Sequence, residues 1–530
     1  MNFDLVLQNG SLLDGTGAAA RPADIGVSGD RVTAIAPAGS LRGGTTLDCR
    51  DLVVCPSFLD THSHSDLAVL REPALDMKSH QGVGLDVVGQ DGIGVAPLSL
   101  AQRATMARTI SGLDGTLGDW DWEDVDGYFA RVQRARPGIH IATLVPHGNI
   151  RLNAMGPDDR PATPGELAEM ERLLDLGMQQ GAVGLSTGLI YPPCCYAQTE
   201  ELVALGRVLA RHDRPIVVHL RSESDYLIEA VDEMLRVGRE SGCRVHISHL
   251  KIAGRTNWAK VDALLGSFDR AAAEGIVLTA DQYPYTAGST MMGAVLPPWM
   301  HDGGPDATLL RLNDPDDRKR AEAAMLAEGP HAWDNFWGWA DAQGIIVSSL
   351  PEGFRPALVG LTVAESAAAD GQGATPIPWL LDLLRDARLA VGMIAFSQSE
   401  EVVAAIAAHP KVNGCTDGLL SGKPHPRAYG AFPRLLGHLV RDRGICALPE
   451  AIRKLTSQAA EALTLRGRGV VAEGGPADLV VFDAATILDR ATYADPRQFP
   501  VGLPHVVIGG ALTVRDGAAT GLRGGQVVRG

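Results

Sequence analysis

The sequence predicts an α/β protein with a (β/α)8 barrel of the TIM type and a small β-sandwich formed from both termini. Through the middle of the chain, apolar strand-like runs alternate with amphipathic helical stretches, and this many β-then-α units favour a closed parallel barrel. Both ends instead carry short runs of β-branched residues broken by Gly, Asp and Asn. A length of 530 residues, 45% of them hydrophobic, suits two or three packed units.

The two ends of the chain share one pattern. Residues 1–56 contain "DLVLQNGSLLDG" and "DIGVSGDRVTAIAP", in which NG and GD are hairpin turn signals. Residues 469–530 repeat the pattern in "GGPADLVVFDAATI" and "HVVIGGALTVRDG". We therefore expect these segments to meet in one sandwich, with residues 57–468 forming the barrel.

The barrel strands are indicated by apolar runs such as "RPIVVHLRSE", "CRVHISHLK" and "IVLTADQYPY". Between them lie helical stretches such as "TPGELAEMERLLDLGMQQ" and "SDYLIEAVDEMLRVGRES". The alternation is interrupted at about 289–350, where the chain is rich in Pro, Trp and Asp ("LPPWMHDGGPD", "HAWDNFWGWA"). We expect an insertion there that forms a small cap.

Composition excludes several classes of partner. The chain has 47 Lys and Arg against 63 Asp and Glu, and it has no basic run of the kind that binds phosphate backbones, so nucleic acid is not expected. No secretory signal and no run of ~18 apolar residues is present, so no membrane is expected either. Seven cysteines without a CxxC motif indicate free thiols in a reducing cytoplasm. The expected partner is a small-molecule substrate, and a homo-oligomer is left open.

Polar residues at strand ends predict a metal site. In "FLDTHSHSD", His62 and His64 lie on one face because alternate strand residues point the same way. His219, His249 and Asp417 each follow a further apolar run. Since parallel strands of a barrel end at one mouth, we expect these four histidines and the carboxylate to converge there. Imidazole and carboxylate ligands suit zinc.

Motifs along nearly the whole chain carry a resemblance to a known family. They are "PSFLDTHSHSD", "GLSTGLIYPP", "HLRSES", "SHLKIAGRTNW", "DQYPYTAGST", "HPRAYGAFPRLLG" and "GGPADLVVFDAATI". The chain resembles the amidohydrolase superfamily and, within it, the N-acyl-D-amino-acid deacylases (D-aminoacylases). The resemblance implies a metal-dependent hydrolase barrel that uses zinc to hydrolyse a linear amide, releasing a carboxylate and a D-amino acid.

The resemblance also implies roles for single residues. His62, His64, His219 and His249 match metal-binding histidines, and Asp417 matches the catalytic aspartate. Positions near the substrate carboxylate or the reacting carbonyl are matched by Lys251, Tyr283 and Ser289.

Two departures from the family pattern matter. The family has a zinc-binding cysteine after the second strand, whereas "VVGQDGIG" places Asp91 there. Aspartate binds zinc through oxygen and can bridge two ions, so we expect Asp91 to be a ligand of one or two zinc ions; the alternative is a solvent-facing Asp91 beside a single ion. Cys194 replaces a glycine in the loop after Tyr191, a candidate substrate contact, and we expect that loop to be reshaped.

The chemistry of amide hydrolysis assigns further roles. Zinc lowers the pKa of bound water to ~7, so that hydroxide can attack the carbonyl. Asp417 is then the general base that takes the proton of the water and the general acid that passes it to the leaving nitrogen. Tyr283 or His219 is a candidate for stabilising the oxyanion. Lys251 and Arg221, each two residues after a metal-binding histidine, are candidate partners for the substrate carboxylate, with an ordinary salt bridge as the alternative.

Other functions on the same scaffold remain open. One is a D-specific dipeptidase, and another is a cyclic-amide hydrolase of the dihydroorotase or hydantoinase kind. The cyclic-amide enzymes bridge their metals with a carboxylated lysine, and the fourth-strand segment "AVGLSTGL" has none, which counts against that alternative. A non-catalytic scaffold is disfavoured because all five metal-site residues are kept.

Overall fold

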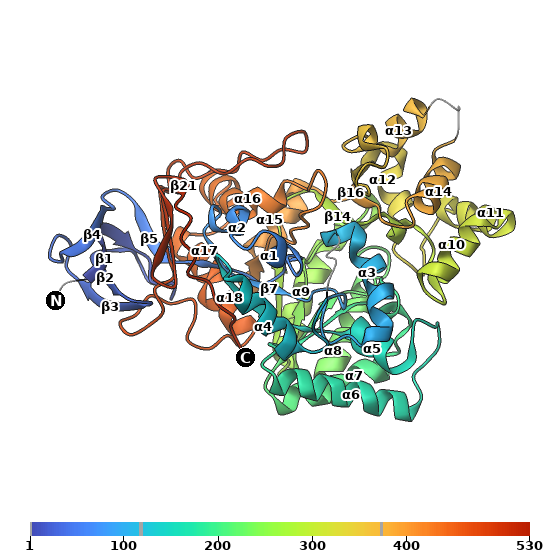
Figure 1. The fold of residues 1–530 in the computed structure, drawn as a ribbon, viewed down its shortest axis with the longest axis horizontal. Coiled ribbons are helices and arrows are strands. Elements are labelled where there is room, and N and C mark those ends of the chain that lie inside the picture. The colour runs from blue at the N-terminus through green and yellow to red at the C-terminus, as the bar shows by residue number, and fades with distance from the viewer. Residues whose placement is uncertain (1–2, 116–119, 371–374) are drawn as a thin grey trace.

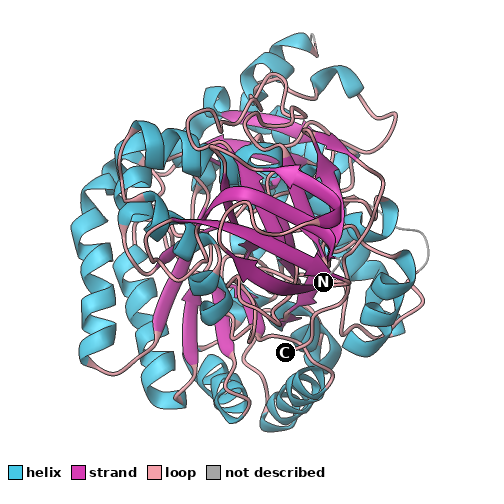
Figure 2. Cartoon of the chain, turned by 90° about the vertical axis from the view of Figure 1, so that its left-hand side faces the viewer, coloured by secondary structure: helices cyan, strands magenta, loops and turns pink. Residues whose placement is uncertain are grey.

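The computed structural model describes residues 3–115, 120–370 and 375–530. Helices surround strands at its centre (Figure 2), and some of these strands form a parallel barrel. Hydrogen bonding orders its strands as β6-β7-β8 and β9-β10-β11-β12-β13-β17. The strands are β6 (Phe58–Asp60), β7 (Val83–Val88), β8 (His140–Thr143), β9 (Val145–Pro146), β10 (Leu185–Gly188), β11 (Pro215–His219), β12 (Arg244–Ile247), β13 (Leu278–Gln282) and β17 (Val412–Gly414).

Contacts beyond the named strands close the ring. Strand β8 runs almost directly into β9, and Leu144 between them donates its amide hydrogen to the carbonyl of Val88 at 3.0 Å. At the opposite seam, Ser63 forms a parallel bridge with Gly418, and the amide of Asp417 donates to the carbonyl of His62 at 2.8 Å. The seam between the first and last strands therefore joins two predicted metal-site residues.

Helices pack on the outside of the barrel because their apolar faces match the buried strands. Strand β11 is buried along its whole length, as expected for a parallel strand that is covered on both faces. Helix α6 begins with a capping box in which Thr163 and Glu166 satisfy each other's backbone amides. The main outer helices are α4 (Val125–Ala135), α6 (Pro164–Gln179), α7 (Thr199–Arg211), α8 (Leu227–Ser241), α9 (Val261–Ala273), α15 (Glu400–Ala408) and α17 (Leu448–Leu455).

The two chain ends form one β structure at one end of the molecule (Figure 1). Strand β18 pairs antiparallel with β5, and both ends contribute to a shared core that includes Leu7, Val54, Leu479 and Val507. This confirms the expected union of the termini, and hydrogen bonds link the described strands in one nine-stranded sheet. The strands are β1 (Phe3–Leu12), β2 (Arg21–Ser28), β3 (Arg31–Ala36), β4 (Gly43–Asp48), β5 (Val53–Pro56), β18 (Leu479–Phe482), β19 (His505–Ile508), β20 (Ala511–Arg515) and β21 (Ala518–Ala519).

The insertion lies at the other end of the molecule, over the barrel (Figure 1). It has its own hydrophobic core and its own antiparallel sheet, ordered β14-β16-β15. It runs to residue 396, beyond the expected limit of about 350, because the strand at its end pairs with the other two strands of the cap sheet. In the sequence, the segment 376–396 looks like one more helix and strand of the barrel. Its elements are β14 (Ala287–Met291), α10 (Pro305–Asn313), α11 (Pro315–Leu326), α12 (Phe336–Gly344), β15 (Ile345–Ser349), α13 (Val363–Ala369), α14 (Pro376–Asp386) and β16 (Gly392–Phe396).

Candidate active site

Six predicted metal-site side chains gather at the carboxyl ends of the barrel strands. His62 and His64 follow β6, and Asp91 follows β7. The remaining three come from the ends of β11, β12 and β17, and are His219, His249 and Asp417. All six are buried. Their donor atoms form three overlapping groups in which every atom lies within 4.8 Å of the others in its group.

Asp91 lies at the centre of this cluster and presents one oxygen to each side. Its Oδ2 lies 3.5 Å from His62 Nε2 and 3.4 Å from His64 Nε2. Its Oδ1 lies 3.4 Å from His249 Nε2 and 4.0 Å from His219 Nδ1. The carboxylate thus faces two separate pairs of histidines, which is the arrangement of a bridging ligand.

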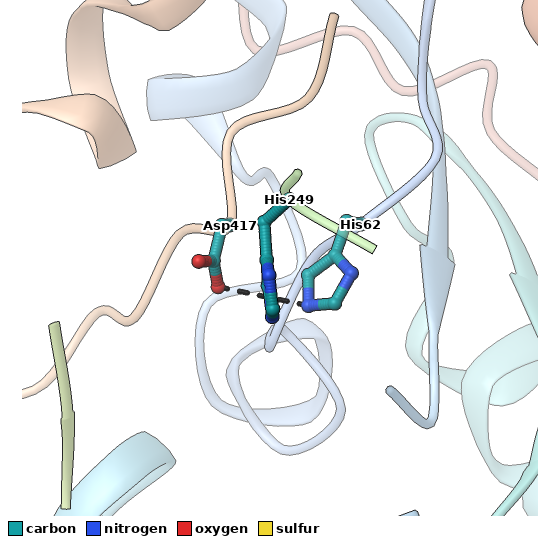
Figure 3. Close-up of side chains that lie close together, drawn as sticks. All are labelled: His62, His249 and Asp417. Atoms are coloured by element: carbon teal, nitrogen blue, oxygen red, sulfur yellow. Dashed lines mark ion pairs between the residues drawn. The ribbon is translucent and has the colours of Figure 1, made fainter. Parts of the chain in front are cut away.

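Asp417 completes the side of the cluster that contains His62 and His64. Its Oδ1 lies 3.3 Å from His64 Nε2 and 3.6 Å from His62 Nε2. Figure 3 shows Asp417, His249 and His62 pointing toward one another, although they come from three separate strand ends. The other oxygen, Oδ2, accepts an ion pair from Arg427 Nη1 at 2.8 Å.

These donors fit zinc by two observations. Two ligand atoms ~2.1 Å from one ion at a tetrahedral angle lie ~3.4 Å apart, and the separations between the carboxylate oxygens and His62 or His64 are 3.3 to 3.6 Å. Nε2 of His62, which faces both Asp91 and Asp417, and Oδ1 of Asp91 are buried without a hydrogen-bond partner. Buried polar atoms without partners are costly in a protein, and a cation would satisfy them.

Three of the cluster residues have left-handed backbone conformations. The φ angles are 55° at Asp91, 35° at His249 and 47° at Asp417. Such angles cost energy for residues other than glycine, and they persist only where neighbouring structure holds them. The amide of His249 is held by Asp281 Oδ1 at 2.5 Å, and that of Asp417 by the carbonyl of His62. These fixed turns aim the side chains into the barrel mouth.

Charge around the cluster keeps its carboxylates ionised. Burial by itself raises the pKa of Asp417, but the positive charges of Arg427 and then His249 outweigh it and hold that pKa well below its ordinary value. Burial likewise opposes ionisation of Asp91, and His62 and His249 lower its pKa well below the usual range. Both groups are therefore acceptors near neutral pH.

The residues expected near the substrate carboxylate line a small cavity beside the cluster. Lys251 Nζ lies 2.5 Å from Glu223 Oε1 and 2.6 Å from His249 Nδ1. Tyr283 is buried, its hydroxyl accepts a hydrogen bond from Gln398, and burial raises its pKa well above the ordinary value. Ser289 lines the same cavity and donates its hydroxyl to a carbonyl of the cap sheet at 2.8 Å. Tyr191 also lines it and packs its ring against His219 at 5.1 Å between centroids.

Arg221 has a different environment from the other four. It lines a larger neighbouring cavity and not the small cavity beside the cluster. Its guanidinium is bound by Glu233 at 2.9 Å and by the carbonyls of Cys195 and Ala197 at 3.0 Å. This is the ordinary salt bridge that was the alternative for Arg221.

Two residues of the site were missed by the sequence reasoning. Arg427, fully buried, binds Asp417, donates to the carbonyl of Ser289 at 2.9 Å and stacks 4.4 Å from the centre of the Tyr283 ring. Glu223 joins Lys251 to His219 and His249, with oxygens 3.5 Å and 3.2 Å from the two imidazoles. The sequence features that could have indicated these two residues are the motif "HPRAYG" shortly after Asp417, which contains Arg427, and the position of Glu223 four residues after His219.

A buried lysine lies behind the cluster and ties its loops together. Lys78 Nζ donates to Asp60 at 2.6 Å, and to the hydroxyls of Ser63 and Thr416 at 2.8 Å. It also lies 3.2 Å from Asp86. Because Ser63 stands between the first two histidines and Thr416 precedes Asp417, this network fixes both ligand loops relative to each other.

A closed parallel barrel with these side chains at its mouth defines a metal-dependent hydrolase. The comparison with known families makes this specific, since a model of the amidohydrolase family matches residues 45–514. The chain belongs to the amidohydrolase family.

Relatives of similar length extend along the whole chain. An N-acyl-D-glutamate deacylase and a D-aminoacylase, both of Alcaligenes xylosoxydans xylosoxydans, are 35% and 33% identical to it; each alignment covers 99% of this chain, and 96% and 97% of the two relatives. Among solved structures, an N-acyl-D-glutamate deacylase of Bordetella bronchiseptica complexed with zinc and a phosphonate inhibitor matches with a TM-score of 0.85 at 32% identity, covering 100% of both chains.

More distant structures share the fold alone. An L-hydantoinase of Arthrobacter aurescens matches over 100% of both chains with a TM-score of 0.52 at 16% identity. Within the described part of the chain, no helix is both long and apolar enough to span a membrane.

Proposed function

We propose that this protein is a zinc-dependent deacylase that hydrolyses the amide bond of N-acyl-D-amino acids, releasing a carboxylate and a D-amino acid. The observation that carries the proposal is the joining of a metal-binding cluster to a cationic corner formed by Lys251 and Arg427 within one small cavity. Full-length similarity to proteins named N-acyl-D-glutamate deacylase and D-aminoacylase supports the choice of substrate class.

Two zinc ions fit the donors. His62, His64, Asp417 and Oδ2 of Asp91 would hold one, and the second would be held by Oδ1 of Asp91 with His219 and His249. Zinc held there would supply Lewis acidity that lowers the pKa of a water to ~7 and polarises a carbonyl oxygen. The solved deacylase complexed with zinc supports this choice of metal.

Asp417 moves the proton in the proposed reaction. Its carboxylate is ionised and oriented by Arg427, so it can take a proton from the attacking water. The protonated carboxyl then gives that proton to the leaving nitrogen, which departs as an amine. The water oxygen remains with the acyl group as the new carboxylate, and the second proton of the water passes to the released amine or to solvent.

The cationic corner orients the amino acid. Its α-carboxylate would lie against Lys251 and Arg427, which Glu223 and Asp417 hold in place. Because the pKa of Tyr283 is raised, its hydroxyl keeps its proton and can donate to the oxygen that becomes negative during attack. Two fixed points do not distinguish the enantiomers, so D selectivity would require a third contact, at the side chain of the amino acid.

The alternatives receive less support. Strand β10 presents Ser186 and Thr187 where the cyclic-amide enzymes need a lysine, and the hydantoinases share only the fold. A D-specific dipeptidase uses the same cluster and differs only in the acyl group. A non-catalytic scaffold would have no need of the orphaned donor atoms described above.

A hydrolysis screen tests the proposal. N-acetyl and N-formyl amino acids of both configurations, D-containing dipeptides and dihydropyrimidines would be incubated with the chelated and the zinc-reconstituted protein. We expect release of D-amino acids from the N-acyl compounds by the zinc form alone. Turnover confined to the cyclic amides, or equal turnover of L compounds, would reject it.

The proposal also covers the cellular location and the oligomeric state of the protein. All seven cysteines are free in the structure, which supports a reducing cytoplasm. A homo-oligomer is testable by light scattering during gel filtration.

A further inference from the structure

A large cavity lies next to the catalytic one. The catalytic cavity itself has a volume of about 30 Å³, enough for one or two water molecules. The neighbouring cavity has a volume of about 520 Å³, and Ile93, Tyr191 and Phe336 line both. Because the catalytic cavity is this small, a bulky part of the substrate must extend past these three side chains toward the larger cavity.

The walls of the large cavity are mainly apolar and aromatic. They include Met106 of helix α3 (Leu100–Asp114), Leu189, Tyr196, Met291 and Leu296. A cavity of ~150 Å³ lined by apolar side chains holds a benzene ring, so this one accepts a group several times larger. Burial of apolar surface would be the main source of binding energy there.

The charged groups of the large cavity offer no open site for an anion. Arg108 is bound by both oxygens of Asp306, at 2.5 and 2.9 Å, and Arg221 is bound by Glu233. Asp159 and Glu233 line the same cavity and equal these two described arginines in number, and Asp334, whose pKa burial raises to about 7, adds negative charge near neutral pH. Of the remaining polar groups, His301 is kept neutral because burial lowers its pKa to about 4. A second substrate carboxylate would lose its water here without the metal-binding cluster that lies beside Lys251 and Arg427 in the catalytic cavity.

We infer that the preferred substrates carry a large, neutral, apolar group in this cavity and no second carboxylate. This rests on the proposed function and narrows it, because two of the similar proteins are named for N-acyl-D-glutamate and N-acyl-D-aspartate. Two parts of a substrate have the required chemistry, namely the acyl group and the side chain of the D-amino acid.

Two substrate series separate these sources. One holds the amino acid as D-alanine and lengthens the acyl group from acetyl to octanoyl; the other holds N-acetyl and varies the side chain through D-alanine, D-leucine, D-phenylalanine and D-glutamate. At about 0.8 kcal/mol per buried methylene, kcat/KM rises about fourfold for each methylene in the series whose group enters the cavity. N-acetyl-D-glutamate is expected at least about 100-fold below N-acetyl-D-leucine.

A variant that fills the cavity gives an independent test. Ala294→Phe projects a ring into the large cavity from a wall that does not line the catalytic one. We expect it to lower kcat/KM for the bulkiest good substrate at least 10-fold and to leave N-acetyl-D-alanine within about twofold. Thr105→Phe, from α3, serves the same purpose if the first variant does not fold.

The outcomes distinguish this inference from the proposed function. Efficient hydrolysis of N-acetyl-D-glutamate, or no gain with size in either series, would overturn the inference and leave deacylation standing. If no N-acyl-D-amino acid is hydrolysed, the proposed function fails, and calorimetric titration of Asp417→Asn with N-octanoyl-D-alanine and N-acetyl-D-glutamate still decides the inference. Tighter binding of the octanoyl compound supports it, and equal or weaker binding overturns it.

Discussion

Replacing Asp417 by asparagine separates charge from shape at the centre of the site. The amide keeps the size of the side chain but cannot accept a proton, and proton transfer by a positioned group is worth about 10²- to 10⁴-fold in rate. The change also leaves Arg427 buried without its anion, whose oxygen lies 2.8 Å away. Removal of one partner of a buried pair costs about 3–5 kcal/mol. Because Arg427 keeps its contacts with the carbonyl of Ser289 and with the Tyr283 ring, we expect the variant to lose about 2–3 kcal/mol of folding stability.

The assay is kcat for the best N-acyl-D-amino acid, with melting temperature and zinc content measured on the same sample. We expect kcat to fall at least 100-fold while zinc stays bound through the histidines and Asp91. The control is Asp478→Asn, another buried aspartate, which pairs with Arg468 at 2.6 Å and contacts His140 at 2.9 Å at the base of the terminal sheet. It should lower stability comparably and leave kcat unchanged. A kcat of Asp417→Asn within tenfold of wild type would refute the assigned role.

Three further predictions concern the metal, its support and the cap. Asp91→Ala should lose at least one equivalent of zinc by elemental analysis, because both oxygens leave the cluster; unchanged stoichiometry would mean that Asp91 is no ligand. Lys78→Met should lower folding stability by about 3–5 kcal/mol and lower the zinc content, because the buried carboxylates of Asp60 and Asp86 lose their cation. A variant that keeps its zinc and its stability would show that Lys78 does not support the metal site. Burial and, after it, the negative charge of Glu223 raise the pKa of Asp334 to about 7. The folding stability linked to this carboxyl is therefore fully present below pH ~4 and is lost as the pH rises to 7. Wild-type melting temperature should therefore fall relative to Asp334→Asn over that range, and parallel curves would contradict it.

The metal donors were predictable from sequence because strand ends of a parallel barrel share one mouth. His62, His64, His219 and Asp417 each stand at or just after an apolar run, so their convergence follows from strand alternation and barrel closure alone. The place of Asp91 needed the family resemblance, because "VVGQDGIG" carries no periodic signal of its own. The structure adds that its two carboxylate oxygens face different histidines, which cannot be read from the sequence.

The features of the site and the cap that were not predicted depend on contacts between segments distant in the sequence. Arg427 follows no strand, and its pairing with Asp417 depends on how the chain turns into α16 (Arg427–Arg434). Arg221 has the same spacing from its histidine as Lys251 has, yet it turns to Glu233 on α8 instead of the cluster. The cap was seen only in part, since the helix and strand at its end resemble a barrel unit until their antiparallel partners are known.

An anomalous diffraction map at the zinc edge, from crystals of the reconstituted protein, tests the metal cluster most directly. We predict two peaks ~3.5–4 Å apart at the barrel mouth, with one oxygen of Asp91 directed at each and Asp417 beside the peak that His62 and His64 share. A map with no peak among these side chains, or with a single peak that Asp91 does not touch, would contradict the two-ion arrangement.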